Sequence, residues 1–233
     1  MALEREKEER RIELPSERMQ RELDRFKTLL AQERPRSSDG AKSLEERLHN
    51  DAKVLGGFPE FRQDNWSLLS PKDRRWALQE AEYRLAQVQG RDAARVYCVD
   101  LSKVKIDGEP IIARGGIITE RGSFQHGYAP GALIQLDLGL LRNDIATRTP
   151  SQAEHVLDAF TEESRHVYQA SAILHPKRHP EVDDSTRQAW YAARLAYADI
   201  KTRKEYDANL LEVDAQQYSV QMKVHRRVEA HSA

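Results

Sequence analysis

Two glutamates and a histidine lie close together in a run whose spacing suits metal chemistry. Glu162 and His166 are four residues apart, and Glu163 directly follows Glu162. In a helix, residues four apart lie on the same face, so Glu162 and His166 could bind one metal ion together. A carboxylate beside them could accept a proton from water. The run therefore indicates a metal-dependent hydrolase, on the condition that it is helical.

The elements that must position these side chains are two helices and a short strand. Apolar residues recur at helical spacing over 152–172, which predicts a helix that carries Glu162 and His166. A strand is expected over 132–136, and a long helix over 202–225 would carry a second acidic run. The apolar positions of the first helix are Val156, Leu157, Phe160, Val167 and Ala170.

The second acidic run is Glu212-Val213-Asp214-Ala215, and the pair Tyr168-Gln169 closely follows the first run. Together with Glu163 and His166, these residues resemble zincin-like metallopeptidases, especially the small bacterial toxin or effector domains. In such families two His and a later Glu bind zinc, and the Glu inside the His-Glu-x-x-His motif acts as general base. The resemblance covers about 132–218 and implies a zincin-like fold for that part of the chain.

Transferred position by position, the resemblance implies that Glu163 is the general base and that His166 and Glu212 are metal ligands. Glu162 stands where the family has its first His. The implied ligand set is therefore Glu162, His166 and Glu212. The resemblance also implies that Asp214 lies behind the ligands, where it would orient His166 or shape the pocket.

The departure at the first ligand affects the metal that we expect. One imidazole and two carboxylates form a harder donor set than two His and one Glu, so Zn²⁺ is expected with Mn²⁺ or Fe²⁺ as alternatives. The added negative charge would make the metal a poorer Lewis acid. Without a metal, one carboxylate would keep a proton or pair with Arg165 or another cation. Tyr168 is a candidate to stabilise a developing oxyanion, and a packing tyrosine is the alternative.

A simpler interpretation of the same run is a solvated helix face over 162–165, with His166 hydrogen-bonded beneath it. Cys98 lies in an apolar strand pattern and is expected to be a buried structural thiol. The basic patches 177–179 and 223–227 are short and flanked by acids, so both are expected to be solvated. The remaining candidates are four histidines expected at the surface and three tryptophans expected in the core or a groove: His126, His155, His175, His179, Trp66, Trp76 and Trp190.

Composition excludes several classes of function. The formal net charge is −1, so no overall positive field would hold nucleic acid. One cysteine excludes an intramolecular disulfide and makes a thiolate zinc cluster improbable. No apolar run is long enough to span a membrane, and the first residues lack an apolar secretion segment. We expect a protein that is cytoplasmic when made, and export would need a route that does not use a signal peptide.

Residue patterns divide the 233-residue chain into three parts. Residues 1–34 predict a charged amphipathic helix for docking, delivery or a coiled coil, with an apolar stripe over 16–33. Residues 35–42 contain Pro, Ser and Gly and predict a linker. Residues 43–233 predict one α+β domain, in which a small, partly antiparallel sheet packs on the helix over 152–172 before a helical C-terminal half. The resemblance implies that this domain is zincin-like, with that helix as the active-site helix. Its earlier elements are expected as helices over 43–54 and 70–89 and strands over 96–101, 111–119 and 123–128.

The resemblance thus implies a metal-dependent peptidase-like toxin or effector domain that hydrolyses a protein substrate through a metal-activated water. A delivery, adaptor or immunity protein would be a further partner. The alternative is a catalytically inactive zincin-like scaffold that binds a protein, because Glu162 replaces the first His. A third interpretation is an assembly protein that works through the helix over 16–33.

Overall fold

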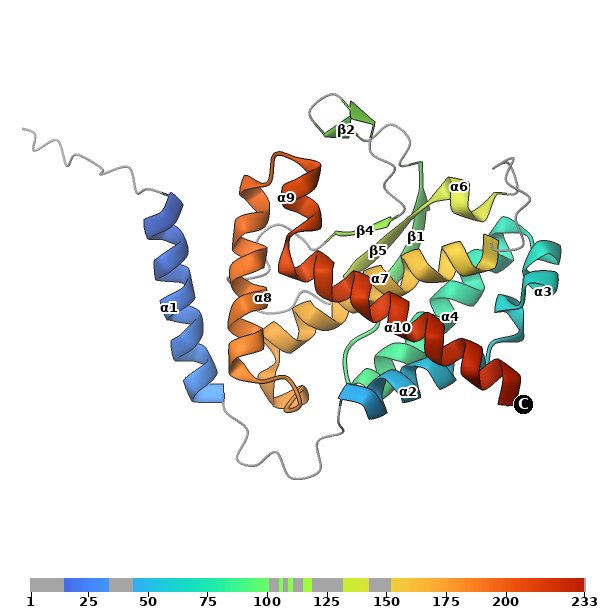
Figure 1. The fold of residues 1–233 in the computed structure, drawn as a ribbon, viewed down its shortest axis with the longest axis horizontal. Helices are drawn as coiled ribbons and strands as arrows, with labels where there is room; N and C mark the ends of the chain where they lie inside the picture. The colour runs from blue at the N-terminus through green and yellow to red at the C-terminus, as the bar shows by residue number, and fades with distance from the viewer. Residues whose placement is uncertain are drawn as a thin grey trace, which may run out of the picture.

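The computed structural model describes residues 15–33, 44–100, 105–106, 109–110, 115–118, 132–142 and 152–232. In this part of the chain, helices surround a small mixed sheet (Figure 1), which confirms the predicted α+β class. None of the described helices has the length and hydropathy that a membrane crossing requires.

The main sheet has three described strands in the order β1-β5-β4. β1 (Arg95–Val99) runs parallel to β5 (Leu133–Asp137), and β4 (Gly115–Ile118) runs antiparallel to β5. The prediction of a partly antiparallel sheet is therefore confirmed, whereas the strand expected over 123–128 lies outside the described residues. A separate two-stranded hairpin consists of β2 (Lys105–Ile106) and β3 (Glu109–Pro110).

The helices frame this sheet and form the C-terminal half. The N-terminal ones are α1 (Pro15–Glu33), α2 (Leu44–Gly56), η1 (Pro59–Phe61), α3 (Gln63–Leu68) and α4 (Pro71–Gln89), and α6 (Leu138–Leu141) follows β5. The C-terminal ones are α7 (Gln152–Leu174), η2 (Pro176–Arg178), α8 (Asp184–Ala196), η3 (Tyr197–Asp199), α9 (Arg203–Asp207) and α10 (Leu210–Ser232).

α7 is the central helix, and its extent confirms the helix predicted over 152–172. It packs against β4 and β5 on one side and against α4, α8 and α10 on others (Figure 1). Val156 and Phe160 are fully buried, and Val167 is nearly so. Because neighbours cover most of its circumference, α7 also buries polar side chains, and these must find partners inside the protein.

α4 has the predicted ends, but its tryptophan lies outside the core. Ser70 accepts a hydrogen bond from the backbone N–H of Asp73, and Gly90 ends the helix at φ +67°, where a residue without Cβ is favoured. Trp76 was expected in the core or in a groove, but 63% of its surface is exposed. The face that packs inward begins one residue later and consists of Ala77, Leu78, Ala81 and Leu85.

The prediction of a single helix over 202–225 is wrong, because the chain forms two helices there, α9 and α10. Thr202 and Glu205 make a capping box that starts α9. Asn209 lies between the two helices, and its Oδ1 accepts the backbone N–H of Leu211 at 2.9 Å. The break lets α9 fold back beside the start of α10 (Figure 1).

The N-terminal helix α1 lies against α8 (Figure 1). Phe26 is 6% exposed and stacks on Tyr191 of α8 with a ring-centroid distance of 4.3 Å. Phe26 belongs to the predicted apolar stripe, so this contact buries part of the stripe within the same chain. The linker expected over 35–42 lies outside the described residues.

Candidate active site

The residues predicted for chemistry converge where α7 crosses the start of α10. His166 on α7 and Glu212 on α10 face each other, with Nε2 and Oε1 3.3 Å apart. Glu163 lies one turn earlier on α7 and is close enough to both for their charges to act on its pKa. Tertiary packing therefore joins the predicted base and two of the three predicted ligands.

The distance between His166 and Glu212 suits a metal ion as well as an ion pair. Two ligands about 2.1 Å from zinc at a tetrahedral angle are separated by roughly 3.4 Å. A charge-assisted hydrogen bond between an imidazolium and a carboxylate is usually shorter, about 2.8 Å. The observed 3.3 Å is thus compatible with a cation larger than a proton between the two atoms.

Gln169 determines which nitrogen of His166 faces Glu212. Its Oε1 lies 2.8 Å from His166 Nδ1, while its Nε2 donates to Asp214 Oδ2 at 2.7 Å and to the backbone carbonyl of Leu211 at 3.1 Å. Since both partners of the amide nitrogen are acceptors, the amide oxygen must point at His166 and accept its Nδ1–H. The Nε2 lone pair then points at a carboxylate, and a proton or a metal must lie between them.

Asp214 is itself held by a buried arginine. Arg165 donates to both oxygens of Asp214, at 2.8 and 3.1 Å. The guanidinium lies 4.7 Å from the centroid of the Tyr168 ring and 4.9 Å from that of Tyr218. Gln169 contacts both side chains, so Asp214 acts on His166 through Gln169. Asp214 would orient His166 by this indirect route.

Glu163 has an unusual environment for a carboxyl group. Burial raises its pKa to about 8, the charges of Glu212 and Glu162 add to the rise, and His166 opposes it. Its Oε2 is buried and has no hydrogen-bond partner among the described residues. With this pKa, the protonated form of Glu163 predominates at neutral pH.

His166 carries the compensating positive charge. Burial acts to lower its pKa, but the hydrogen bond to Glu212 and the charges of Glu163 and Glu212 raise it to about 9. Burial raises the pKa of Glu212, and the contacts with His166 and two tyrosines outweigh it, so that this pKa is lowered. The site therefore pairs an imidazolium with a carboxylate.

The two tyrosines are functional candidates that sequence reasoning missed. Tyr197 in η3 donates a hydrogen bond to Oε1 of Glu212. Tyr206 on α9 is near enough to help lower the pKa of Glu212, and its ring meets that of Tyr197 edge-on at 5.8 Å. No spacing rule links these residues to Glu212, because an irregular turn and a helix break bring them there.

Two predicted site residues lie apart from this centre. Glu162 is partly exposed and acts on Glu163 through its charge. The described residues contain no group of three His, Cys, Asp or Glu side chains that could hold a metal, so Glu162 is not gathered with His166 and Glu212. Tyr168 is buried, and its hydroxyl donates to Glu181 beside Arg47, which is the packing role considered as the alternative.

Several simpler expectations are wrong. Residues 162–165 are not a solvated face, because Glu163, Ser164 and Arg165 are all buried. His179 is fully buried rather than at the surface, because the turn η2 folds it under α7, where its Nε2 lies 2.8 Å from Ser171 Oγ. His155, Lys177 and Arg178 are exposed as expected, Cys98 is half-buried, and His126 lies outside the described residues.

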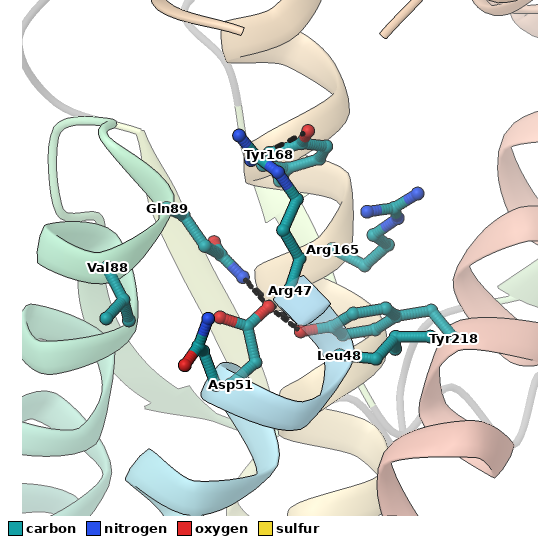
Figure 2. Close-up of a pocket in the computed structure, with 9 residues that line it drawn as sticks. Arg47, Leu48, Asp51, Val88, Gln89, Arg165, Tyr168 and Tyr218 are labelled. Carbon is teal, nitrogen blue, oxygen red and sulfur yellow. Dashed lines mark hydrogen bonds between the residues drawn. The ribbon is translucent and has the colours of Figure 1, made fainter. Parts of the chain in front are cut away.

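A small polar pocket lies behind Arg165, between α2, α4, α7 and α10 (Figure 2). Asp51 faces into it and accepts hydrogen bonds from Gln89 at 2.9 Å and from Tyr218 at 2.7 Å. Burial raises the pKa of Asp51. The pocket is lined by Arg47, Leu48, Asn50, Asp51, Val88, Gln89, Arg165, Tyr168 and Tyr218.

Comparison with protein-family models, with curated proteins and with solved structures found no match for this chain. The support for a function is therefore the geometry just described and the sequence resemblance. Both concern Glu163, His166 and Glu212, and the resemblance adds Glu162.

Proposed function

We propose that this chain is a zincin-like, metal-dependent peptidase of the toxin or effector kind, which hydrolyses a protein substrate. The observation that carries the proposal is the buried Oε2 of Glu163, which has no partner among the described residues, beside an imidazole whose Nε2 is directed at Glu212. An unsatisfied buried oxygen is costly and calls for a water, an ion or a reacting group.

The described residues fit a divalent ion at two of three positions. His166 and Glu212 offer an imidazole nitrogen and a carboxylate oxygen at a suitable spacing. Glu162, four residues before His166, is the candidate for the third position and would have to turn toward them. Zn²⁺ is the favoured ion, with Mn²⁺ or Fe²⁺ as alternatives for a carboxylate-rich set. When bound, the ion would polarise the scissile carbonyl and make water more acidic.

The protein's own groups would perform the proton transfers. The charge of a bound ion would favour the ionised form of Glu163, which could then accept a proton from the attacking water and deliver it to the leaving amine. Its burial makes the carboxylate more basic than one in water, which suits this role. Gln169 and Asp214 would keep His166 in the tautomer that presents Nε2.

The test is metal content together with catalysis. We expect near-stoichiometric metal in the purified protein by elemental analysis, and its loss in Glu162→Ala and His166→Ala. Glu163→Gln should keep the metal and lower proteolysis of a protein substrate by about 10²–10⁴-fold. Proteolysis that survives Glu163→Gln at the parent rate would overturn the proposal.

One observation favours a second candidate, a catalytically inactive zincin-like scaffold that binds a protein partner. The described residues form no three-donor metal group, and Glu stands at the first-ligand position. A stable protein without metal, whose partner binding is unchanged by Glu163→Gln, would establish this alternative. In either case, cytoplasmic synthesis, signal-peptide-independent export, and docking or delivery through 1–34 remain part of the proposal.

A further inference from the structure

We infer that the outer edge of β1, which faces away from β5, and the stripe of α4 beside it form a docking surface for an extended acidic segment of a partner protein. This inference goes beyond the proposed function and needs no metal. None of the residues that form the surface belongs to the candidate active site. They are Lys72, Arg75, Trp76 and Gln79 on α4, and Arg95 and Tyr97 on β1.

The backbone of β1 presents hydrogen-bonding groups along this edge. In the described part of the chain, β1 has one neighbouring strand, β5. The N–H of Arg95 points toward β5, because it donates to the carbonyl of Ala132 at 2.9 Å. Successive peptide groups of a strand point to alternate sides, so the N–H and C=O groups of Val96 and Cys98 point away from β5.

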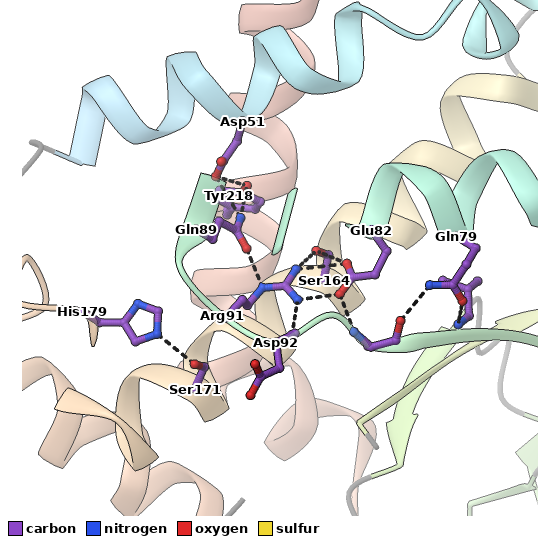
Figure 3. A network of polar contacts seen from close by, with 12 residues as sticks. Asp51, Gln79, Glu82, Gln89, Arg91, Asp92, Ser164, Ser171, His179 and Tyr218 are labelled. Atoms are coloured by element: carbon purple, nitrogen blue, oxygen red, sulfur yellow. Dashed lines mark hydrogen bonds and ion pairs between the residues drawn. The ribbon is translucent and has the colours of Figure 1, made fainter. Parts of the chain in front are cut away.

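The side chain of Gln79 shows what this edge binds (Figure 3). Its Oε1 accepts the N–H of Val96 at 2.8 Å, and its Nε2 donates to the carbonyl of Ala94 at 2.9 Å. The amide thus makes the two hydrogen bonds that one residue of a parallel neighbouring strand would make. The next outward pair, the C=O of Val96 and the N–H of Cys98, has no strand partner among the described residues and is placed to bind an added strand.

Two large aromatic side chains are exposed near this backbone pair. Trp76 lies one turn before Gln79 on α4, and 63% of its surface is exposed. Tyr97 lies between Val96 and Cys98 on β1, and 42% of its surface is exposed. Tryptophan and tyrosine are enriched in protein interfaces, because they bury a large apolar area at little cost in conformational entropy. They would contact the side chains of an added strand.

The charge of the surface selects an acidic partner. Burial raises the pKa of Cys98 to about 11, and the charge of Arg75, one turn before Gln79, opposes the rise, so Arg75 lies close to the strand. Arg75, Lys72 and Arg95 are exposed, and none of them forms an ion pair with a described residue. Nucleic acid would also be attracted to these cations, but it has no peptide backbone to pair with β1. The acidic side chains on the exposed face of α4 have partners of their own, Asp73 with Ser70 and Glu80 with Arg84.

The experiment measures binding of defined peptides to the full chain by fluorescence anisotropy. The probe is a short, end-blocked peptide of alternating glutamate and valine. Three comparison probes separate the causes of binding: the same peptide with every peptide nitrogen methylated, a lysine–valine peptide of equal length, and an oligothymidylate. The protein variants are Arg75→Glu and Trp76→Ala. Lys53→Glu is the matched control, because it makes the same change in net charge as Arg75→Glu at an exposed side chain on α2. Melting temperatures are recorded for every variant.

We expect the glutamate–valine peptide to bind the parent, and the methylated and lysine–valine peptides to bind at least about tenfold more weakly. Arg75→Glu should weaken binding about 3–10-fold and Trp76→Ala about tenfold, whereas Lys53→Glu should leave the affinity unchanged. If a variant does not fold, the peptide series on the parent decides the matter.

The inference would be overturned by a parent that does not bind the glutamate–valine peptide, or by parent-like affinity in both folded variants. Equal binding of the methylated peptide would also overturn it, and so would tighter binding of the oligothymidylate. These measurements involve neither metal content nor proteolysis, so a failure here leaves the proposed function standing.

Discussion

Glu82 and Glu163 are buried carboxyl groups on neighbouring helices, α4 and α7, but only Glu82 has partners on both oxygens. Arg91 donates to Oε1 and, at 3.0 Å, to Oε2 of Glu82. Ser164 Oγ donates to Oε2 at 3.0 Å, and the backbone N–H of Ala94 donates to Oε1 at 2.9 Å (Figure 3). Glu163, directly before Ser164, leaves Oε2 without a partner among the described residues.

The difference separates a structural network from a candidate reactive group. The Glu82 network extends through Arg91 and Gln89 to Asp51, so it ties together α2, α4 and α7 (Figure 3). A fully satisfied buried network stabilises one arrangement of helices. A buried carboxyl with an open oxygen costs stability, and proteins retain such groups mainly where they act on something.

The largest effect should come from breaking the satisfied network. Arg91→Leu leaves Glu82 buried without its cation, and we expect a loss of about 3–5 kcal/mol in the free energy of unfolding, measured by urea denaturation. The control is Arg84→Leu, which breaks the exposed pair with Glu80 and should cost at most about 1 kcal/mol. Equal losses of unfolding free energy in the two variants would show that the buried pair contributes no more than the exposed one.

Removing both charges should cost much less than removing one. The double variant Glu82→Met with Arg91→Leu has no buried charge left unpaired, so we expect it to recover at least about half of the stability lost in Arg91→Leu. The same urea titrations supply the double-mutant cycle. A double variant as unstable as the single one would mean that packing or the hydrogen bond to Ser164, and not charge, dominates the network.

The opposite sign is expected at Glu163 in the metal-free protein. Its pKa is about 8 in the folded state and about 4.5 in the unfolded state. Folding therefore disfavours the charged carboxylate, and the free energy of unfolding falls as the pH rises from about 4.5 to 8. Glu163→Gln lacks this loss and should be more stable by about 1–3 kcal/mol at pH 7. The gain should vanish at pH 4, and unfolding curves at both pH values test it. A gain of equal size at pH 4 would exclude the carboxyl as its cause.

The smallest effect should come from an exposed carboxylate with a defined structural role. Asp183 caps α8, and its hydrogen bonds with Ser185 and Thr186 lower its pKa to about 2. Asp183→Ala should cost about 1 kcal/mol at pH 7, measured by thermal unfolding. Because this pKa is lowered, the cost should shrink as the pH falls toward 2. A cost that does not change with pH would show that the carboxylate charge plays no part in the cap.

Much of the fold was predictable because its signals are local. The ends of α4 follow from Ser70-Pro71 and Gly90. For α8 the sequence offers Asp183 or Asp184 as the cap, and the structure has Asp183. The extent of α7 follows from apolar residues at helical spacing. The sequence does not predict the break before α10. Apolar residues continue at helical spacing across Asn209, although the first helix ends there.

The sequence by itself determined that Glu162, Glu163 and His166 share one helix, and the resemblance added Glu212 from another. Only the tertiary structure decided that Glu163 is buried, that Gln169 sets the tautomer of His166, and that Glu162 is not gathered with His166 and Glu212. It alone brought Tyr197 and Tyr206 to Glu212. The physical reason is that helical spacing depends on neighbours along the chain, whereas burial and hydrogen-bond partners depend on which helices pack together.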